Sequence, residues 1–258
     1  MDLSNVVRPR FLITAMALGL LFLAAACGAE PTPTVAPTPT VAPTPTPQPE
    51  VSLDALRFSA REKLAAISTV KFRMVDELES GAKFFGMKLK NVEGEVKSPD
   101  RFRMVVDVET PNFGFVEIEM LAVGEQAYMK FSEDAPWAPL PLDQVPFNFG
   151  EIGIALSELL PVLENAAITG RESVGDAETV RIDGDVLSED LSNLITSVDP
   201  GHAVTLTFWL DEIDHTVRQF RIDGKIYNDD APGTKRLVSI TDVNVPVDVQ
   251  LPDIASEP

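Results

Sequence analysis

The chain of 258 residues carries 21 Lys and Arg against 40 Asp and Glu, a formal net charge of −19, and contains a single cysteine. An acidic charge of this size argues against nucleic acid as a partner and against charge-driven adhesion to an anionic bilayer, because both surfaces would repel the protein. One cysteine excludes an intramolecular disulfide, so the roughly 200 residues beyond the N-terminal segments must be stabilised by a hydrophobic core.

The N-terminus has the pattern of an export signal. Arg8 and Arg10 precede an uncharged run over residues 11–26, which ends in three alanines and is followed by Cys27. The run is too short, and too rich in small residues at its end, for a transmembrane helix. Small residues directly before a cysteine resemble the lipobox of bacterial lipoproteins, although Ala24 occupies a position where that motif usually has Leu.

We interpret Cys27 as the lipidation site of the mature chain. Two or three acyl chains on this residue would form a stable anchor, since each buried methylene contributes about 0.8 kcal/mol. The expected location is therefore the outer face of the cell membrane. The alanines at 24–26 also satisfy the rule for ordinary signal peptidase, which would instead release a soluble protein with a free N-terminal thiol.

Residues 27–50 are expected to form a spacer between the anchor and a folded domain. The hexapeptide Pro-Thr-Pro-Thr-Val-Ala at 31–36 recurs at 37–42, and such a density of proline favours polyproline II over packed structure. At about 3.1 Å per residue the segment could reach on the order of 70 Å. The sequence thus predicts a signal peptide at 1–26, a lipidated cysteine and disordered tether at 27–50, and a folded domain at 51–258.

The first half of the domain predicts a helix followed by a β-meander. Ser52 can cap a helix over 53–67, whose apolar residues recur every three or four positions. The period then changes to two, and each run presents apolar residues on one face and polar residues on the other. Strands are expected on this basis near 70–74, 87–89, 101–110, 116–122 and 127–131.

The meander is interrupted at 137–149, where several prolines exclude a central strand and predict a loop against the core. A helix is expected over 152–163, with Pro161 kinking or splitting it. Ser188 is expected to cap a further short helix. Strands are expected near 167–174, 178–186, 204–210, 220–226 and 236–245.

These elements predict an α+β fold, with about ten strands in one large curved antiparallel sheet and helices packed on its apolar, concave face. A sheet of this size coils strongly, so its concave side must either be filled by side chains or hold a ligand. All five methionines of the mature chain lie on the expected apolar face. They could fill gaps in an ordinary core, which is the simpler reading, or line an adaptable ligand-binding wall.

Catalytic and metal-binding patterns are absent from the sequence. His202 and His215 have no third ligand at a metal-like spacing, and no nucleophile-elbow or phosphate-binding glycine motif occurs. The Ser-x-x-Lys match at 68–71 has no companion motif. The acidic groups at 211–214 and 229–230 are explained as solvated turn residues. We therefore expect no enzyme activity, no cofactor and no metal.

Four stretches of the chain carry a family resemblance: 165–174, 178–186, 204–210 including Trp209, and 242–252. They resemble the LppX/LprG (LppX_LprAFG) family of mycobacterial-type lipoproteins. The resemblance implies a half-barrel related to the LolA and LolB lipoprotein carriers, with helices over the concave face and an apolar cavity for acyl chains. The chain departs from the family at 143–150, which reads Asp-Gln-Val-Pro-Phe-Asn-Phe-Gly where members tend to carry Asp-Pro turns. If this segment borders the cavity, the cargo would differ.

With this resemblance, the sequence predicts a monomeric, membrane-anchored lipoprotein that binds acylated lipids or glycolipids and carries or presents them in the cell envelope. Expected partners are the lipid cargo, the membrane through the N-terminal lipid, and a membrane transporter, but no nucleic acid. The alternative is a non-enzymatic envelope sensor or structural lipoprotein with a filled core and a protein partner, and an enzyme ranks third. Residues expected to line the cavity are Phe72, Met74, Met87, Leu89, Phe102, Met104, Val106, Val116, Ile118, Met120, Met129, Phe131, Leu156, Leu159, Leu160, Leu163, Leu191, Leu194, Leu206 and Phe208.

Overall fold

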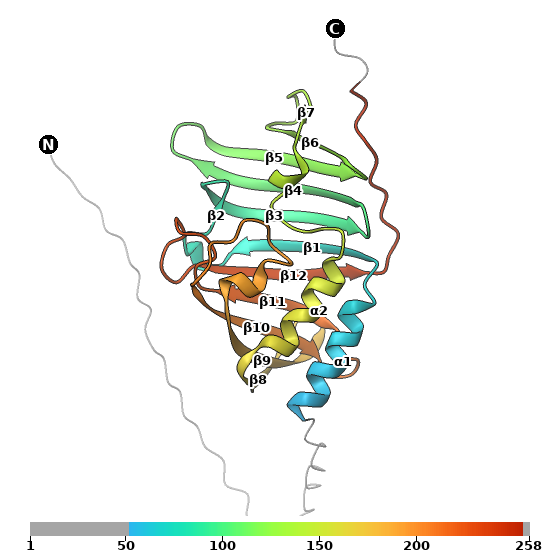
Figure 1. The fold of residues 1–258 in the computed structure, drawn as a ribbon, viewed down its shortest axis with the longest axis vertical. Coiled ribbons are helices and arrows are strands. Elements are labelled where there is room, and N and C mark those ends of the chain that lie inside the picture. The colour runs from blue at the N-terminus through green and yellow to red at the C-terminus, as the bar shows by residue number, and fades with distance from the viewer. Residues whose placement is uncertain (1–51, 255–258) are drawn as a thin grey trace, which may run out of the picture. The chain divides into compact units, whose positions relative to one another are not determined.

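The computed structural model describes residues 52–254, so the predicted signal peptide, Cys27 and the tether lie outside the described residues. In the described part, twelve strands form one antiparallel sheet, and helices cover one of its faces (Figure 1). The predicted α+β fold is confirmed, with two more strands than the ten expected.

The N-terminal half starts with α1 (Leu53–Ala65). Ser52 caps this helix, because its Oγ accepts a hydrogen bond from the Ala55 N–H at 3.2 Å. The strands that follow pair largely in chain order, as short hairpin connections favour, and β2 pairs only with β3. The elements are β1 (Thr69–Asp76), η1 (Glu77–Glu79), β2 (Lys83–Phe84), β3 (Met87–Lys97), β4 (Arg101–Thr110), β5 (Gly114–Val123), β6 (Gln126–Lys130), β7 (Ala138–Pro139) and η2 (Leu142–Gln144).

The C-terminal half begins with α2 (Ile152–Val162) and then builds a second meander, which runs from the far edge of the sheet back to its centre. Its last strand pairs antiparallel with β1, so the two halves meet in the middle of the sheet (Figure 1). Asn244 supports this closure, since its Oδ1 accepts a hydrogen bond from the Ser68 N–H at 2.8 Å. The elements are β8 (Glu164–Val174), β9 (Ala177–Leu187), η3 (Ser188–Leu191), β10 (Ala203–Asp211), β11 (Val217–Asp223) and β12 (Lys235–Val243).

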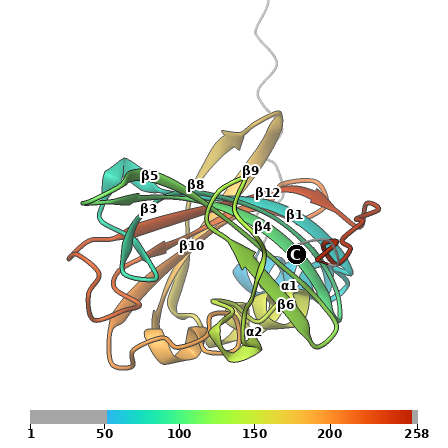
Figure 2. The same ribbon diagram turned by 90° about the horizontal axis from the view of Figure 1, so that it is seen from above.

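The sheet bends around its helices, as Figure 2 shows from above. Each helix buries an apolar stripe, which in α1 consists of Leu56, Ala60 and Leu64. Arg57, on the same helix, donates from Nε to the Leu160 carbonyl at 2.9 Å. This bond satisfies one of the carbonyl groups that the end of α2 leaves without a helical partner.

Gly153 allows the first turn of α2 to approach the end of α1. A Cβ at this position would lie 2.5 Å from the Leu64 carbonyl oxygen and 3.0 Å from that of Ile67. Alanine normally stabilises a helix interior by about 1 kcal/mol relative to glycine, but here the two segments would have to separate. We expect Gly153→Ala to lower the free energy of unfolding, measured in urea, by about 1–3 kcal/mol.

Gly170→Ala is the control for this prediction, because a Cβ at Gly170 would meet no atom within 4 Å. If Gly153→Ala leaves the protein as stable as the wild type, or makes it more stable, then helix propensity outweighs the close approach and our account of Gly153 is wrong.

Three local predictions need correction. The second helix is not split, since α2 runs through Pro161 and ends one residue later at Val162. Ser188 is the first residue of the 3-10 helix η3 rather than its cap. The strand expected to reach Ile226 ends at Asp223, where the chain enters a loop that leads to β12.

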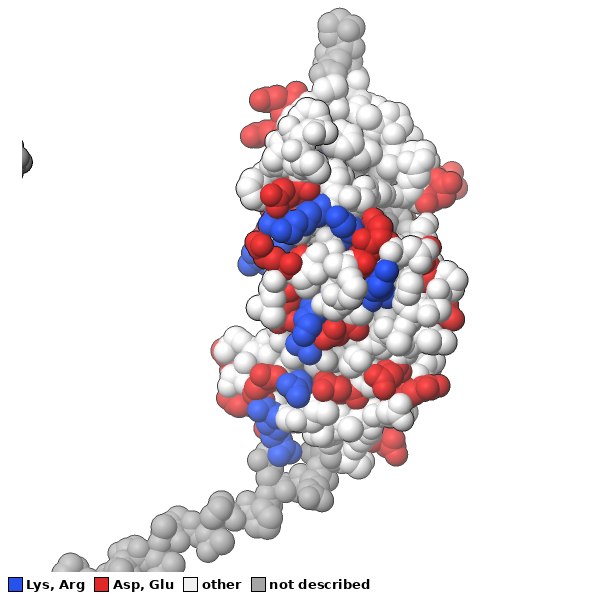
Figure 3. Space-filling view, turned by 90° about the vertical axis from the view of Figure 1, so that its left-hand side faces the viewer, with Lys and Arg blue, Asp and Glu red and all other residues white. Residues whose placement is uncertain are grey.

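The outer face of the sheet carries charged side chains that pair across strands. Glu119 lies between Arg103 and Lys130, with N–O distances of 2.6 Å and 2.9 Å. Figure 3 shows cationic and anionic side chains next to each other on one side of the molecule. The outer face is not polar throughout as expected, because the segment after β12 packs Val247 and Val249 against Leu121.

Candidate functional site: an apolar cavity under the second helix

A cavity of ≈ 120 Å³ lies between the central strands of the sheet and α2. Because β1 and β12 pair with each other, the cavity lies where the two meanders meet. Its lining comes from five strands, from α2, and from the segments at 146–147, 194–195 and 226–227. The lining residues are Val70, Phe72, Met74, Lys83, Phe84, Met104, Pro146, Phe147, Ile152, Leu156, Leu194, Ile195, Phe220, Ile222, Ile226, Tyr227, Arg236, Val238 and Ile240.

The segment before α2 covers one side of this cavity. The Phe147 ring lies edge-on to the rings of Phe72 and Phe102, with centroids 6.3 Å and 5.1 Å away. The backbone of the segment is held in place by hydrogen bonds from the Asn148 N–H to the Leu194 carbonyl at 2.9 Å and from the Thr196 N–H to the Pro146 carbonyl at 3.2 Å. The Thr196 hydroxyl also donates to the Val145 carbonyl at 2.5 Å, so the segment at 145–148 is tied to the segment at 194–196.

A row of apolar side chains leads from the cavity into the N-terminal meander. Phe72, Gly94, Met104, Met120 and Met129 are paired directly with one another across β1, β3, β4, β5 and β6. The Phe72 ring occupies the space above Gly94. A Cβ on residue 94 would lie 2.5 Å from the Cζ of Phe72. Met104 lines the cavity, whereas Met120 has no exposed surface. Phe72 and Met104 belong to the cavity wall, and the thioether side chains behind them can repack easily.

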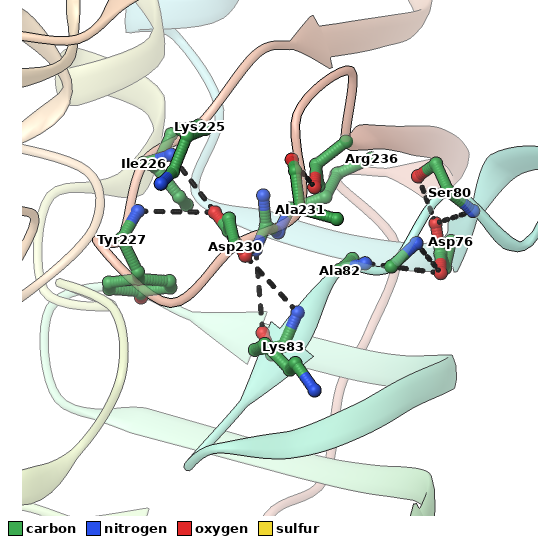
Figure 4. A network of polar contacts seen from close by, with 12 residues as sticks. Asp76, Ser80, Ala82, Lys83, Lys225, Ile226, Tyr227, Asp230, Ala231 and Arg236 are labelled. Atoms are coloured by element: carbon green, nitrogen blue, oxygen red, sulfur yellow. Dashed lines mark hydrogen bonds and ion pairs between the residues drawn. The ribbon is translucent and has the colours of Figure 1, made fainter.

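The opposite end of the cavity is polar. Arg236, on β12, donates from Nη2 to Asp230 Oδ1 at 2.6 Å, and Asp230 also accepts hydrogen bonds from the N–H groups of Ile226 at 3.0 Å and Tyr227 at 3.1 Å (Figure 4). Burial raises the pKa of the Tyr227 phenol, and the negative charge of Asp230 acts in the same direction although Arg236 opposes it. This network ties the loop after β11 to the start of β12.

Comparison with protein families identifies the chain. Residues 66–250, more than half of the chain, match the model described as LppX_LprAFG lipoprotein. The chain belongs to this family. No curated protein matches the sequence.

Two solved structures are similar to this member of the LppX_LprAFG family. The crystal structure of LprF from Mycobacterium bovis aligns with a TM-score of 0.59 and 14% identity, over 79% of this chain and 97% of LprF. Lipoprotein LppX from Mycobacterium tuberculosis aligns with a TM-score of 0.52 and 16% identity, over 77% and 98%. A LolA superfamily protein from Nitrosomonas europaea aligns with a TM-score of only 0.25. At these identities, the first two likenesses show a common fold.

The structure distributes the twenty residues expected at the cavity over several environments. Phe72, Met74, Met104, Leu156 and Leu194 line it. Three others, at 87, 116 and 129, are partly buried against the core. The residues that are packed in the core and do not line the cavity are Leu89, Phe102, Val106, Ile118, Met120, Leu159, Leu160, Leu163, Leu191, Leu206 and Phe208.

Phe131 lies away from the cavity. It follows the last residue of β6, Lys130, and its side chain is 54% exposed. The alternation of apolar residues extends the expected strand to Phe131, but the hydrogen-bonded strand ends one residue earlier, so no pairing holds this side chain on the inner face.

Several lining residues of this LppX_LprAFG domain are not singled out by the sequence. Phe147 lies in the loop at 143–150, and the structure shows that this segment borders the cavity. Arg236 alternates with Val238 and Ile240 along β12, and all three line the cavity. This alternation is the sequence feature that could have placed the arginine on the inner face.

The acidic turn residues are only partly as expected. Asp211 Oδ1 accepts a hydrogen bond from the Ile213 N–H at 2.8 Å, which is turn chemistry. However, Asp211 is 6% exposed and Asp230 is 4% exposed, so the expectation of solvated charge is wrong for both. Each is paired with an arginine, at 218 and 236 respectively.

Within residues 52–254, no helix is long and apolar enough to cross a bilayer. The same residues contain no group of three or more His, Cys, Asp and Glu side chains arranged to hold a metal ion.

Proposed function

We propose that this LppX_LprAFG lipoprotein binds the acyl chains of lipids or glycolipids in the cavity under α2, and carries or presents them in the cell envelope. The observation that carries the proposal is the cavity itself, whose lining is apolar except at one end. Acyl chains are unfavourable in water. Burial of 400 Å² of their apolar surface lowers the free energy by roughly 10 kcal/mol, at about 25 cal/mol/Å². The reaction is binding alone, and no residue acts as a catalyst.

The volume of the cavity limits the size of the ligand that it can hold. At ≈ 120 Å³ it is smaller than the about 300–1,000 Å³ of pockets that enclose drug-sized ligands. In this form it suits part of a single acyl chain. A cargo with several chains requires the cover at 145–149 or α2 to move outward, and the methionine row offers room for repacking on the sheet side.

We also propose that Cys27 carries the lipid anchor and that the chain at 27–50 lets the domain reach away from the outer face of the membrane. Membership of a lipoprotein family supports an exported envelope protein. The small residues directly before Cys27 support lipidation at this position. A membrane transporter that loads or unloads the domain completes the proposal.

The test of the binding proposal is lipid analysis of the protein purified from its own membranes or from a lipid-containing host. We expect organic extracts to contain more acylated lipid per mole of protein than extracts of a control lipoprotein purified in the same steps, measured by mass spectrometry. Extracts that match the control would contradict the proposal.

A second candidate function is an envelope sensor or structural lipoprotein whose interior is solid. The observation that favours it is that most of the apolar residues on the inner face, among them Phe102, Ile118 and Met120, are fully buried by other side chains. In this case the cavity would be a packing gap without a ligand. Substitutions at Met104 and Met120 separate the two functions, as described in the Discussion.

A further inference from the structure

The polar end of the cavity contains an ion pair that is almost completely buried. Arg236 is 3% exposed and Asp230 is 4% exposed. Asp230 uses all four acceptor positions of its carboxylate: Oδ2 accepts from Ile226 and Tyr227, while Oδ1 accepts from Arg236 Nη2 at 2.6 Å and from the Lys83 N–H at 3.3 Å (Figure 4). The carboxylate is therefore satisfied.

The Arg236 Nη2 also donates to the Lys83 carbonyl at 3.5 Å, and the guanidinium lies 5.6 Å from the centroid of the Tyr227 ring, but the arginine is satisfied only in part. Its Nη1 is buried and has no hydrogen-bond partner among residues 52–254. Buried donors in native proteins nearly always have an acceptor, so a group of this kind requires an explanation. Asp230 has no acceptor position left for it, since the N–H groups of the loop and of β2 occupy them.

The position of Arg236 shows what kind of acceptor could reach it. Arg236, Val238 and Ile240 alternate along β12, and all three line the cavity. At about 3.4 Å per residue, this row is roughly 14 Å long. Met74 and Phe72 lie beside it on β1, paired with Val238 and Ile240. The cavity thus has an apolar length with a cationic group at one end.

The charged side chains that line this end of the cavity are basic. The two charged residues that line the cavity, Lys83 and Arg236, are both cationic. No ion pair of Lys83 is formed among the residues that the structure describes. Asp230 neutralises the charge of Arg236 but leaves Nη1 as a free donor, and Lys83 keeps its charge. A ligand whose head carries oxygen acceptors therefore meets donors here.

We propose that Arg236 is the polar anchor of the cavity, and that its Nη1 donates a hydrogen bond to the carboxyl oxygen of a single acyl chain lying along Val238 and Ile240. A free fatty acid and an acyl ester both supply this acceptor. The proposal rests on the proposed function, because it assumes that acyl chains enter the cavity, and adds which end of the chain is held and by which group.

The experiment compares three ligands with the same tail: palmitate, methyl palmitate and hexadecane, each delivered to the lipid-free protein from cyclodextrin. Binding is measured by displacement of the fluorescent apolar probe diphenylhexatriene. We expect palmitate to bind about tenfold or more tightly than hexadecane, since a hydrogen bond to a charged donor typically contributes this much. Methyl palmitate distinguishes the sources: if it equals palmitate, an ester carbonyl suffices, and if it equals hexadecane, the ligand is a free acid.

Arg236→Lys retains a cation beside Asp230 but removes the forked donor. We expect the affinities of this variant for palmitate and for hexadecane to lie within about threefold of each other. Arg221→Lys is the matched control, because Arg221 lies between Phe220 and Ile222 on β11 and therefore faces away from the cavity. It should leave the preference for palmitate unchanged.

The outcomes separate the two proposals. If none of the three ligands displaces the probe, and none stays with the protein after cyclodextrin is removed by gel filtration, the proposed function fails. If all three bind with equal affinity to the wild type, or if Arg236→Lys retains the full preference, only the anchor is refuted, and water rather than ligand satisfies Nη1.

If Arg236→Lys does not fold, the wild type still decides the matter. With palmitate labelled with carbon-13 at its carboxyl group, an anchored carboxylate gives one narrow resonance shifted from that of palmitate in cyclodextrin. A carboxyl resonance that stays at the free position would overturn the anchor.

Discussion

Met104→Trp is expected to reduce the lipid that co-purifies with the protein by about tenfold or more, while the free energy of unfolding changes by less than about 1 kcal/mol. Met104 lines the cavity from β4, so the larger indole can extend into the open space beside Phe72 and Phe147 instead of displacing packed atoms. The filled cavity then has no room for an acyl chain. Quantitative mass spectrometry of extracted lipid and urea denaturation of the same preparation measure the two effects.

Met120→Trp is the matched comparison. Met120 is the direct cross-strand neighbour of Met104, but it has no exposed surface and does not line the cavity. The same substitution should therefore overpack the core and lower the free energy of unfolding by about 1–3 kcal/mol. If Met104→Trp destabilises the protein as much as Met120→Trp and lipid is absent from both and from the wild type, the interior is solid and the structural or sensor function is favoured.

Cys27→Ser is expected to shift the protein from the membrane fraction to the soluble fraction and to abolish its labelling by radioactive palmitate. Serine can carry no thioether-linked lipid, and each acyl chain that is lost removes about 0.8 kcal/mol of membrane affinity per methylene. Two or three chains would hold the wild type almost permanently, whereas the variant would have only its acidic surface, which anionic lipids repel. Fractionation of cells followed by immunoblotting measures the shift.

Intact mass spectrometry of the wild-type N-terminus provides the control for Cys27. A lipidated chain begins at Cys27 and carries the mass of its acyl groups, whereas cleavage by ordinary signal peptidase leaves an unmodified thiol. An unmodified wild-type terminus, or a Cys27→Ser variant that remains in the membrane fraction, would show that the anchor lies elsewhere.

Much of the local structure follows from the order of residues alone. The change from a spacing of three or four residues to a spacing of two places the first helix and the strands at 101–110, 116–122 and 204–210, because each period puts apolar side chains on one face. The same alternation assigns Met104 and Met120 to the inner face. The prolines of the segment before α2 keep it out of the centre of the sheet, where a residue without an N–H would break the ladder.

What the alternation cannot distinguish is a packed side chain from one beside open space. Met104 and Met120 look equivalent along the chain, and only the position of α2 and Phe147 over the sheet leaves room next to the first. The pairing of β1 with β12 likewise joins residues from opposite ends of the domain, and it places Phe72 and Met74 beside Ile240 and Val238 on the cavity wall. The sequence by itself determined which face most strand side chains occupy, since that depends on neighbours along the chain, and it failed at Phe131, where the strand ends. The tertiary structure alone decided where the two layers separate, because that depends on contacts between segments that no local pattern relates.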